Sequence, residues 1–237
     1  MAQKILHSVM RGLSNDWIEH RGEIVVIGLG RFGSALAHTL VEMGYEVLGV
    51  DSNDDIVQRH SGTLTHVVRA DTTDERALRQ IGAADAITAA VCIGNGIEAS
   101  VLTTTALVDL GVKNIWAKAI TESHGRILQR VGAHHVVFPE AEMGNRVAHL
   151  LTGQMMEYIV LDDDFVIVET AVPPEYVGNQ LGSSNIRARH RVTVVCVKPD
   201  GGQFTYASPD TVLGQHDLIV IAGHRNDVEK FAMRQPR

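Results

Sequence analysis

The feature that most constrains the fold is an apolar, β-branched run that ends in spaced glycines, Ile-Val-Val-Ile-Gly-Leu-Gly-Arg-Phe-Gly over residues 24–33. In such a pattern Gly28 permits a tight turn and Gly30 allows a pyrophosphate to approach backbone N–H groups. Gly33 lets the following segment, which has apolar residues at helical spacing, lie close to the strand. The run therefore predicts a strand, a turn and a helix whose N-terminus faces an anion.

A second apolar strand, predicted over 46–50, ends at Asp51. Asp51 follows the glycine pattern by about 20 residues, as expected for the carboxylate that accepts hydrogen bonds from a ribose. A lone glycine pattern is weak evidence, but strand, glycines, helix, second strand and terminal carboxylate together are specific. They predict that an adenine nucleotide binds here.

Composition excludes several other classes of protein. The 237 residues are 45% hydrophobic and 21% charged with a net charge of −7, and no basic tract could follow a phosphate backbone, so nucleic acid is not an expected partner. Cys92 and Cys196 each lie in an apolar run and are predicted to be small buried hydrophobes in a reducing cytoplasm. No run of 18 apolar residues and no signal-peptide pattern is present, so we do not expect the chain to cross a membrane.

From residue 23 onward, strand and helix patterns alternate, which is typical of parallel βαβ units. Thr72 and Glu75 have the spacing of a capping box at the start of one helix, and Gly111 is a predicted C-cap of another. Six strands with crossovers predict an α/β fold, a Rossmann-like doubly wound parallel sheet in the order 3-2-1-4-5-6. Its strands are expected at 24–27, 46–50, 65–68, 86–93, 114–119 and 135–138, and a last helix at 139–151.

After Gly153 the pattern changes to shorter runs separated by Pro-Pro and Gly-Gly turns. Strands predicted at 165–172, 192–197, 203–206 and 218–222, with a final helix at 225–233, indicate a small α+β domain with antiparallel pairing. The expected organisation is an N-terminal extension (1–21), a nucleotide-binding domain (22–153) and a C-terminal domain (154–237). The extension is either a short amphipathic helix or a frayed tail.

Ligands of an open parallel sheet bind outside the carboxyl ends of its strands, so the residues that follow each strand are the candidates for the site. They are Gly28, Leu29, Gly30, Arg31, Phe32, Gly33, Asp51, Ser52, Ala70, Asp71, Ile93, Asn95, Lys118 and Glu140.

Four of these residues carry charge and allow two interpretations each. Arg31 could bind a terminal phosphate or be a solvated first-turn arginine, although a cation there opposes the helix dipole. Lys118 is a second phosphate contact or a snorkelling edge residue. Asp71 contacts the adenosine or caps the next helix. Glu140 complements a helix dipole or holds a divalent cation that bridges phosphates.

Catalytic and metal-binding patterns are weak. Among the twelve histidines, His134 and His135 are adjacent near a strand and would point to opposite faces, which does not suit one metal ion. The region after residue 153 offers no Ser/His/Asp or Cys/His set and is small for a substrate domain. We therefore expect a nucleotide sensor that is not an enzyme, with an NAD(P)-dependent oxidoreductase as the alternative.

Four segments, 26–33, 44–51, 114–119 and 139–144, resemble the regulator of K⁺ conductance (RCK) family, and most closely its KtrA/TrkA-type potassium-uptake regulatory subunits. The arginine inside the glycine loop and Pro-Glu-x-x-Met-Gly at 139–144 are more specific than the glycines. The resemblance extends from about Glu23 to Phe231 and so covers both predicted domains.

The resemblance implies a cytoplasmic homodimer that assembles into a ring, an octamer, at the inner face of the cell membrane. Such rings dock beneath a membrane potassium channel or transporter and gate it, with ATP favouring the active state and ADP the inactive one. By position, Arg31 matches the arginine that reaches the γ-phosphate, Asp51 the ribose carboxylate and Lys118 a phosphate contact. Glu140 matches the residue that holds a divalent cation, Mg²⁺ or Ca²⁺. Some members prefer NAD(H), and Asp51 suits the ribose of either nucleotide.

The C-terminal domain resembles the RCK C-lobe, which in several relatives binds cyclic di-AMP across a dimer interface. The residues at the corresponding positions are Asn185, Arg187, Ala207, Ser208 and Pro209. A plain dimerisation domain is the alternative, and a cyclic di-AMP receptor that acts mainly through this domain is a third hypothesis for the function. The extension of 21 residues is longer than the family leads us to expect, so it is either a docking arm or a sign that the chain is the cytosolic part of a channel.

Overall fold

The computed structural model describes residues 23–151, 155–162 and 164–234. The chain divides into two compact units between Glu140 and Ala141, inside helix α7 (Pro139–Leu151). The sequence-based domain boundary at 153/154 falls just beyond the other end of the same helix, so the domain limits remain a prediction. The N-terminal extension 1–21, with its predicted amphipathic helix, lies outside the described residues.

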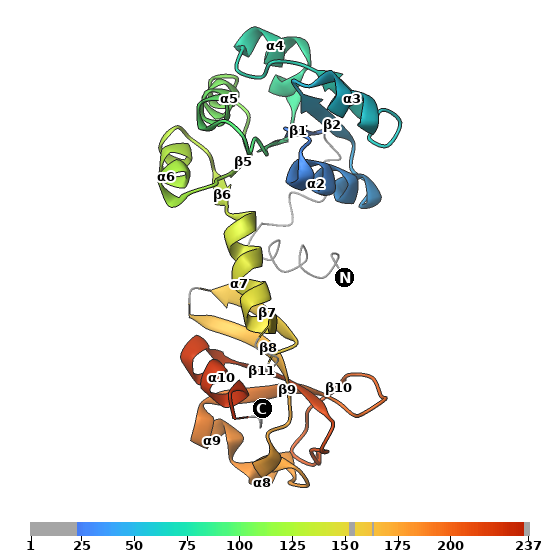
Figure 1. Cartoon of the computed structure of the whole chain (residues 1–237), viewed down its shortest axis with the longest axis vertical. Coiled ribbons are helices and arrows are strands. Elements are labelled where there is room, and N and C mark those ends of the chain that lie inside the picture. Colours follow the sequence, from blue (N-terminus) through green and yellow to red (C-terminus); the bar gives the residue numbers. More distant parts are fainter. Residues whose placement is uncertain (1–22, 152–154, 163, 235–237) are drawn as a thin grey trace. The chain divides into compact units, whose positions relative to one another are not determined.

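Unit 1 alternates strands with helices from its first described strand to α7 (Figure 1). Its elements are β1 (Ile24–Ile27), α2 (Arg31–Glu42), β2 (Val47–Asp51), α3 (Asp54–His60), β3 (His66–Arg69), α4 (Glu75–Gln80), the 3₁₀ turn η3 (Ala83–Asp85), β4 (Thr88–Val91), α5 (Ile97–Asp109), β5 (Ile115–Lys118), α6 (Glu122–Arg130), β6 (His135–Val137) and α7.

The six strands form one parallel sheet in the order β3-β2-β1-β4-β5-β6, which confirms the predicted doubly wound topology. Successive side chains of β1 enter different cores: Val25 and Ile27 pack in one cluster, and Ile24 and Val26 in another. Every residue of β1 is buried, as expected for a strand that helices cover on both faces. At about 1.5–3 kcal/mol for each fully buried large apolar side chain, these two cores hold the sheet in place.

The start of α4 differs from the one expected. The predicted capping box of Thr72 and Glu75 is wrong, because α4 is capped by Asp74, whose carboxylate accepts a hydrogen bond from the Arg76 N–H. The hydroxyl of Thr72 is buried instead and is hydrogen-bonded to that of Thr103 on α5. Gly111 follows α5 with φ +81°, as expected for a residue that ends a helix.

Unit 2 is built on a five-stranded sheet in the order β10-β9-β11-β8-β7, and all of its pairs are antiparallel. Its elements are β7 (Glu157–Asp162), β8 (Phe165–Ala171), the 3₁₀ turn η4 (Pro174–Tyr176), α8 (Leu181–Ser184), α9 (Ile186–His190), β9 (Val192–Lys198), β10 (Thr205–Tyr206), β11 (Leu218–His224) and α10 (Arg225–Ala232). The antiparallel α+β organisation is thus confirmed.

The sequence did not predict β7. This edge strand lacks the alternation that marks a half-buried strand, because Ile159, Val160 and Leu161 are all exposed. Tyr158 supplies its contact with the core, being buried with its hydroxyl hydrogen-bonded to Glu229. Among the described residues of both units, no helix is long and apolar enough to span a membrane.

Candidate functional site

The glycine loop between β1 and α2 is shaped by two glycines at which a side chain would be strained or would clash. Gly28 has φ +88°, and a Cβ on it would lie 3.1 Å from the backbone of Cys92 and Ile93. A Cβ on Gly33 would lie 1.9 Å from the carbonyl oxygen of Gly28, so the helix packs directly on the turn. By contrast, a Cβ on Gly30 would have no atom within 4 Å and would project into open space.

The N-terminus of α2 has the properties of an anion site. Gly30 is its N-cap, no side chain caps the helix, and its first turn contains no acidic residue. Unpaired N–H groups at a helix N-terminus and the helix dipole both favour a negatively charged ligand. Arg31, exposed in the first turn, adds a guanidinium to this end.

Asp51 ties the glycine loop to the end of β2. One carboxylate oxygen accepts a hydrogen bond from the Leu29 N–H at 2.8 Å, and the other accepts one from the Asn53 N–H at 2.9 Å. A carboxylate has about four acceptor positions, so Asp51 keeps capacity for a ligand hydroxyl. The carboxylate therefore serves the loop before any ligand binds, a role the sequence did not reveal.

Lys118 provides a buried cation next to the loop. It is only 7% exposed at the end of β5, and its Nζ forms an ion pair with Oε1 of Glu140 in the first turn of α7. The same ammonium lies 5.7 Å from the centroid of the Phe32 ring. This burial contradicts the alternative of a snorkelling edge residue.

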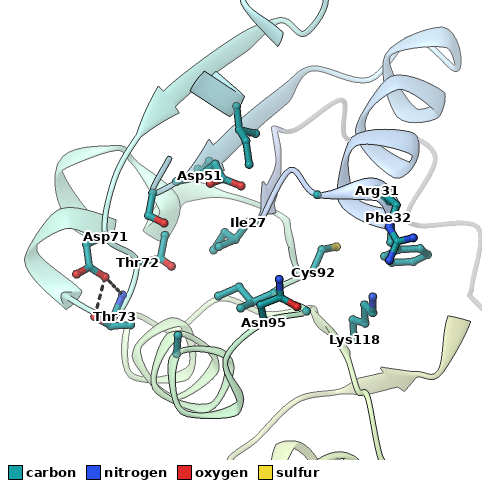
Figure 2. A pocket seen from close by; sticks show the side chains of 18 of the residues that line it. Ile27, Arg31, Phe32, Asp51, Asp71, Thr72, Thr73, Cys92, Asn95 and Lys118 are labelled. Atoms are coloured by element: carbon teal, nitrogen blue, oxygen red, sulfur yellow. Dashed lines mark hydrogen bonds between the residues drawn. The ribbon is translucent and has the colours of Figure 1, made fainter. Parts of the chain in front are cut away.

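Glu140 pairs with Lys118 and is also close enough to Arg31 to be affected by its charge. The hydrogen bond from Lys118 lowers the pKa of its carboxyl, and the charge of Arg31 acts in the same direction. Its side chain is 62% exposed although it is paired, so a carboxylate oxygen is accessible to solvent. Figure 2 shows Arg31, Phe32 and Lys118 together at this end of the pocket.

The opposite end is formed by the segment after β3 (Figure 2). Asp71 accepts hydrogen bonds from the N–H and the hydroxyl of Thr73, at 3.1 and 2.7 Å, and these bonds lower its pKa. Asp71 does not cap α4, because Asp74 does. The interpretation of Asp71 as a helix cap is therefore wrong, and its turn instead faces the pocket.

These residues surround one cavity of about 650 Å³ at the carboxyl ends of the strands, a size typical of small-molecule sites. Of the fourteen predicted site residues, all except Leu29 and Gly33 line it. Leu29 contributes its N–H to Asp51 while its side chain is buried in the core, and Gly33 packs beneath Gly28. Both act on the shape of the loop.

Sequence reasoning missed part of the lining. Cys92 is buried in the cavity wall, and burial raises the pKa of its thiol to about 12, so it is a neutral, apolar contact, as the buried interpretation of Cys92 expected. Thr72 and Thr73 also line the cavity and could have been found by extending the strand-end rule by two residues. Ile120 could have been found by the same rule, since it directly follows the strand predicted at 114–119. Ile56 in α3 carries no such signal, because only the folded chain brings it to the site.

A second cavity, of about 620 Å³, lies within unit 2. It brings together all five residues predicted for a second ligand: Asn185, Arg187, Ala207, Ser208 and Pro209. Apolar side chains including Leu181 and Val192 line it as well, and Arg187 is exposed. The other cysteine of the chain, Cys196, is half-buried on β9.

The adjacent histidines His134 and His135 make different contacts. His134 accepts a hydrogen bond from the Ile115 N–H, whereas His135 stacks on Trp116 with ring centroids 4.1 Å apart. Over the part of the chain that the structure describes, no group of three or more His, Cys, Asp or Glu side chains is placed to hold a metal ion.

The topology defines a class of protein, a Rossmann-like unit with a cavity at the carboxyl ends of its strands, joined to a small antiparallel unit. Comparisons with known proteins identify the family. The family model of the TrkA-N domain matches residues 24–139, and that of the TrkA-C domain matches residues 165–234. The chain is 35% identical over 210 residues to Ktr system potassium uptake protein A of Bacillus subtilis (strain 168), covering 88% of this chain and 95% of the relative. The chain therefore belongs to the Ktr/TrkA family of potassium uptake proteins.

Solved structures agree with this fold. The GsuK RCK domain has a TM-score of 0.63 at 22% identity, and the GsuK channel bound to NAD has a TM-score of 0.63 at 21% identity. Each match covers 92% of this chain, but this chain spans only 48% and 40% of those two chains. At this level of identity the likeness establishes the RCK-type fold alone.

Proposed function

We propose that this chain is the nucleotide-sensing regulatory subunit of a membrane potassium uptake system and is not an enzyme. Its family supports the link to potassium uptake, and the cavity of unit 1 supports the binding of an adenine nucleotide. The observation that carries the proposal is the pairing of an uncapped helix N-terminus with Arg31 and buried Lys118 at one end of that cavity.

In this proposal the cationic end holds the phosphates and Asp51 accepts hydrogen bonds from the ribose. Arg31 contacts the third phosphate, so that ATP and ADP make different contacts with the protein. A ligand shifts a conformational equilibrium only through such a difference in contacts. Charge-assisted hydrogen bonds of about 1.5–3 kcal/mol per site, repeated around an oligomer, would suffice for a switch.

The first test compares ATP, ADP and NADH by calorimetric titration of the full chain and of Arg31→Ala. We expect ATP affinity to fall by roughly 10- to 100-fold, with a smaller loss for ADP, because the guanidinium makes its strongest contact with the third phosphate. Arg79→Ala is the control, since this exposed arginine of α4 lies outside the cavity. NADH binding tighter than ATP and ADP, with no effect of Arg31→Ala, would reject the ATP sensor in favour of an NAD(H) site, which the NAD-bound GsuK channel makes the foremost competitor.

A divalent cation, Mg²⁺ or Ca²⁺, is part of the proposed nucleotide site. Glu140 suits it, because such ions take few protein carboxylates when phosphate oxygens supply the other ligands. Glu140→Gln should remove the dependence of ATP affinity on Mg²⁺, measured as the ratio of the ATP affinities in Mg²⁺ and in EDTA. An unaltered Mg²⁺ dependence in this variant would exclude Glu140 as the metal ligand.

For the assembly we propose a homodimer that forms an octameric ring at the cytoplasmic face of the membrane and docks on a potassium channel or transporter subunit. The family membership supports such a partner. Multi-angle light scattering in ATP and in ADP tests the ring, and co-purification with a membrane potassium uptake subunit of the same organism tests the docking. A monomer in both nucleotides would reject the ring.

A second ligand, cyclic di-AMP, is proposed for the cavity of unit 2. The observation that favours it is that the five residues matched to the family site line one cavity, where Arg187 supplies a cation for a phosphate. Calorimetry on the full chain and on Arg187→Ala tests this, with Arg189→Ala, an exposed neighbour outside the cavity, as the control. No heat of binding to the full chain would leave unit 2 as a plain dimerisation domain.

A further inference from the structure

Two histidines from neighbouring helices of unit 1 meet at its surface, and neither of them lines the nucleotide cavity. His38 lies in the third turn of α2 and His60 is the last residue of α3. Nε2 of His38 and Nδ1 of His60 are 3.3 Å apart, and the ring centroids are 5.3 Å apart with the planes tilted by 53°. Both side chains are half-buried, so solvent reaches the pair.

This distance matches that between two ligands of one metal ion. Zinc–nitrogen bonds of about 2.0–2.1 Å in a tetrahedron place two imidazole nitrogens roughly 3.3–3.4 Å apart. Without a metal, the N–H of one ring donates to the lone pair of the other. A metal ion receives both lone pairs when the donating ring carries its proton on its other nitrogen and the two rings turn so that the facing nitrogens point at the ion.

We infer that His38 and His60 form a binding site for a first-row divalent metal ion of the Zn²⁺, Ni²⁺ or Cu²⁺ type. Imidazole nitrogen suits these ions, whereas Mg²⁺ and Ca²⁺ require oxygen ligands. Within the described residues no third histidine, cysteine or carboxylate joins the pair, so water completes the coordination. The site is therefore distinct in chemistry and in position from the cation that we propose at Glu140.

A metal ion here would cross-link α2 and α3, the two helices that follow the glycine loop and the end of β2 in the cavity lining. α2 begins at the glycine loop, and α3 is capped by Asn53, whose N–H donates to Asp51. An ion that binds only the folded pair stabilises unit 1 by mass action, whether or not a nucleotide is present. Metal binding at this pair therefore requires no nucleotide.

The test uses the full chain after EDTA treatment and removal of the chelator, without nucleotide. Ni²⁺ is titrated calorimetrically into the unaltered chain, His38→Gln, His60→Gln and the control His66→Gln, which changes an exposed histidine of β3 outside the pair. Each pair variant should bind one Ni²⁺ fewer per chain, and the control should bind as many as the unaltered protein. Glutamine keeps a polar side chain at these partly exposed positions, and circular dichroism checks that each variant is folded.

Two further measurements do not depend on the variants. Pulsed electron paramagnetic resonance of bound Cu²⁺ should detect two imidazole nitrogens, and Ni²⁺ should raise the thermal midpoint of the unaltered chain whereas Mg²⁺ should not. Ni²⁺ stoichiometry that is the same in His38→Gln and in the unaltered chain, or a Cu²⁺ signal with one nitrogen, would overturn the inference.

Discussion

At the scale of single residues, Gly30 and Gly33 make opposite contributions although they belong to one motif. Gly33 has no room for a side chain, since a Cβ would meet the Gly28 carbonyl oxygen at 1.9 Å. Gly30 has room in the ligand-free protein and a conformation, φ −67° and ψ −168°, that alanine adopts. Gly33 therefore serves the fold, and we propose that Gly30 serves the phosphates of the ligand.

This contrast predicts how two alanine variants differ. Gly33→Ala should lower the free energy of unfolding by several kcal/mol, in the upper range for single substitutions, because α2 must move off the turn. Gly30→Ala should change stability by less than about 1 kcal/mol but weaken nucleotide binding, because its methyl group occupies the space left for a pyrophosphate. Urea unfolding and ATP titration of both variants check this.

The variants Gly30→Ala and Gly33→Ala serve as controls for each other. If Gly30→Ala binds ATP as tightly as the unaltered chain while remaining fully folded, the loop is not the phosphate site. A Gly33→Ala variant of normal stability would show that the turn and helix relax with little cost.

At the scale of elements, α4 shows which residue determines a helix start. The sequence offered Thr72 with Glu75, but Asp74 caps the helix through the Arg76 N–H at 2.8 Å. Asp74→Ala should therefore cost about 0.5–2 kcal/mol of stability, as expected for a lost N-cap. Glu75→Ala should cost less, because it removes only an exposed pair with Arg79.

Chemical denaturation of the two variants at neutral pH measures this difference. A larger loss for Glu75→Ala than for Asp74→Ala would restore the capping box and contradict the hydrogen bond to Asp74. Thr72 is a poor test, since its hydroxyl is buried against Thr103 and its removal disturbs the packing of α5.

Most of the strands and their order could be predicted from the sequence. Apolar runs and glycine turns predicted the six parallel strands and their order, because the two-sided core requires such runs. The carboxyl-end rule then predicted most of the cavity lining from position alone. Edge strand β7 was missed, because its exposed Ile159, Val160 and Leu161 do not alternate with polar residues.

Contacts between residues far apart in the chain could not be predicted from the sequence. The hydrogen bond from Leu29 to Asp51 and the ion pair of Lys118 with Glu140 each join residues 22 positions apart. Sequence spacing indicates that such side chains reach the same edge of the sheet, but which groups pair there depends on the folded geometry. The His38–His60 contact escaped notice for the same reason, since each histidine alone is ordinary.

At the scale of the whole molecule, four histidines make stability depend on pH. They are His60, His124, His135 and His190. Burial is the main cause that lowers the pKa of each of them below the ordinary value of 6.5. Below about pH 6.5 the unfolded chain binds protons that the folded chain does not. The free energy of unfolding should therefore fall as the pH drops below about 6.5, and these groups add no dependence at higher pH.

His124 isolates one part of this effect. It is 1% exposed, its Nδ1 accepts a hydrogen bond from the Ile120 N–H, and its Nε2 has no partner among the described residues. His124→Asn keeps an acceptor near Nδ1 but does not titrate. The loss of stability between pH 7.5 and 5.5 should be smaller in this variant, by up to about 1.4 kcal/mol per pH unit, the limit for one proton. Urea unfolding at both pH values and one protein concentration measures it, with His66→Asn, an exposed site, as the control. An equal loss in His124→Asn and the unaltered chain would show that the buried ring contributes nothing to the acid sensitivity.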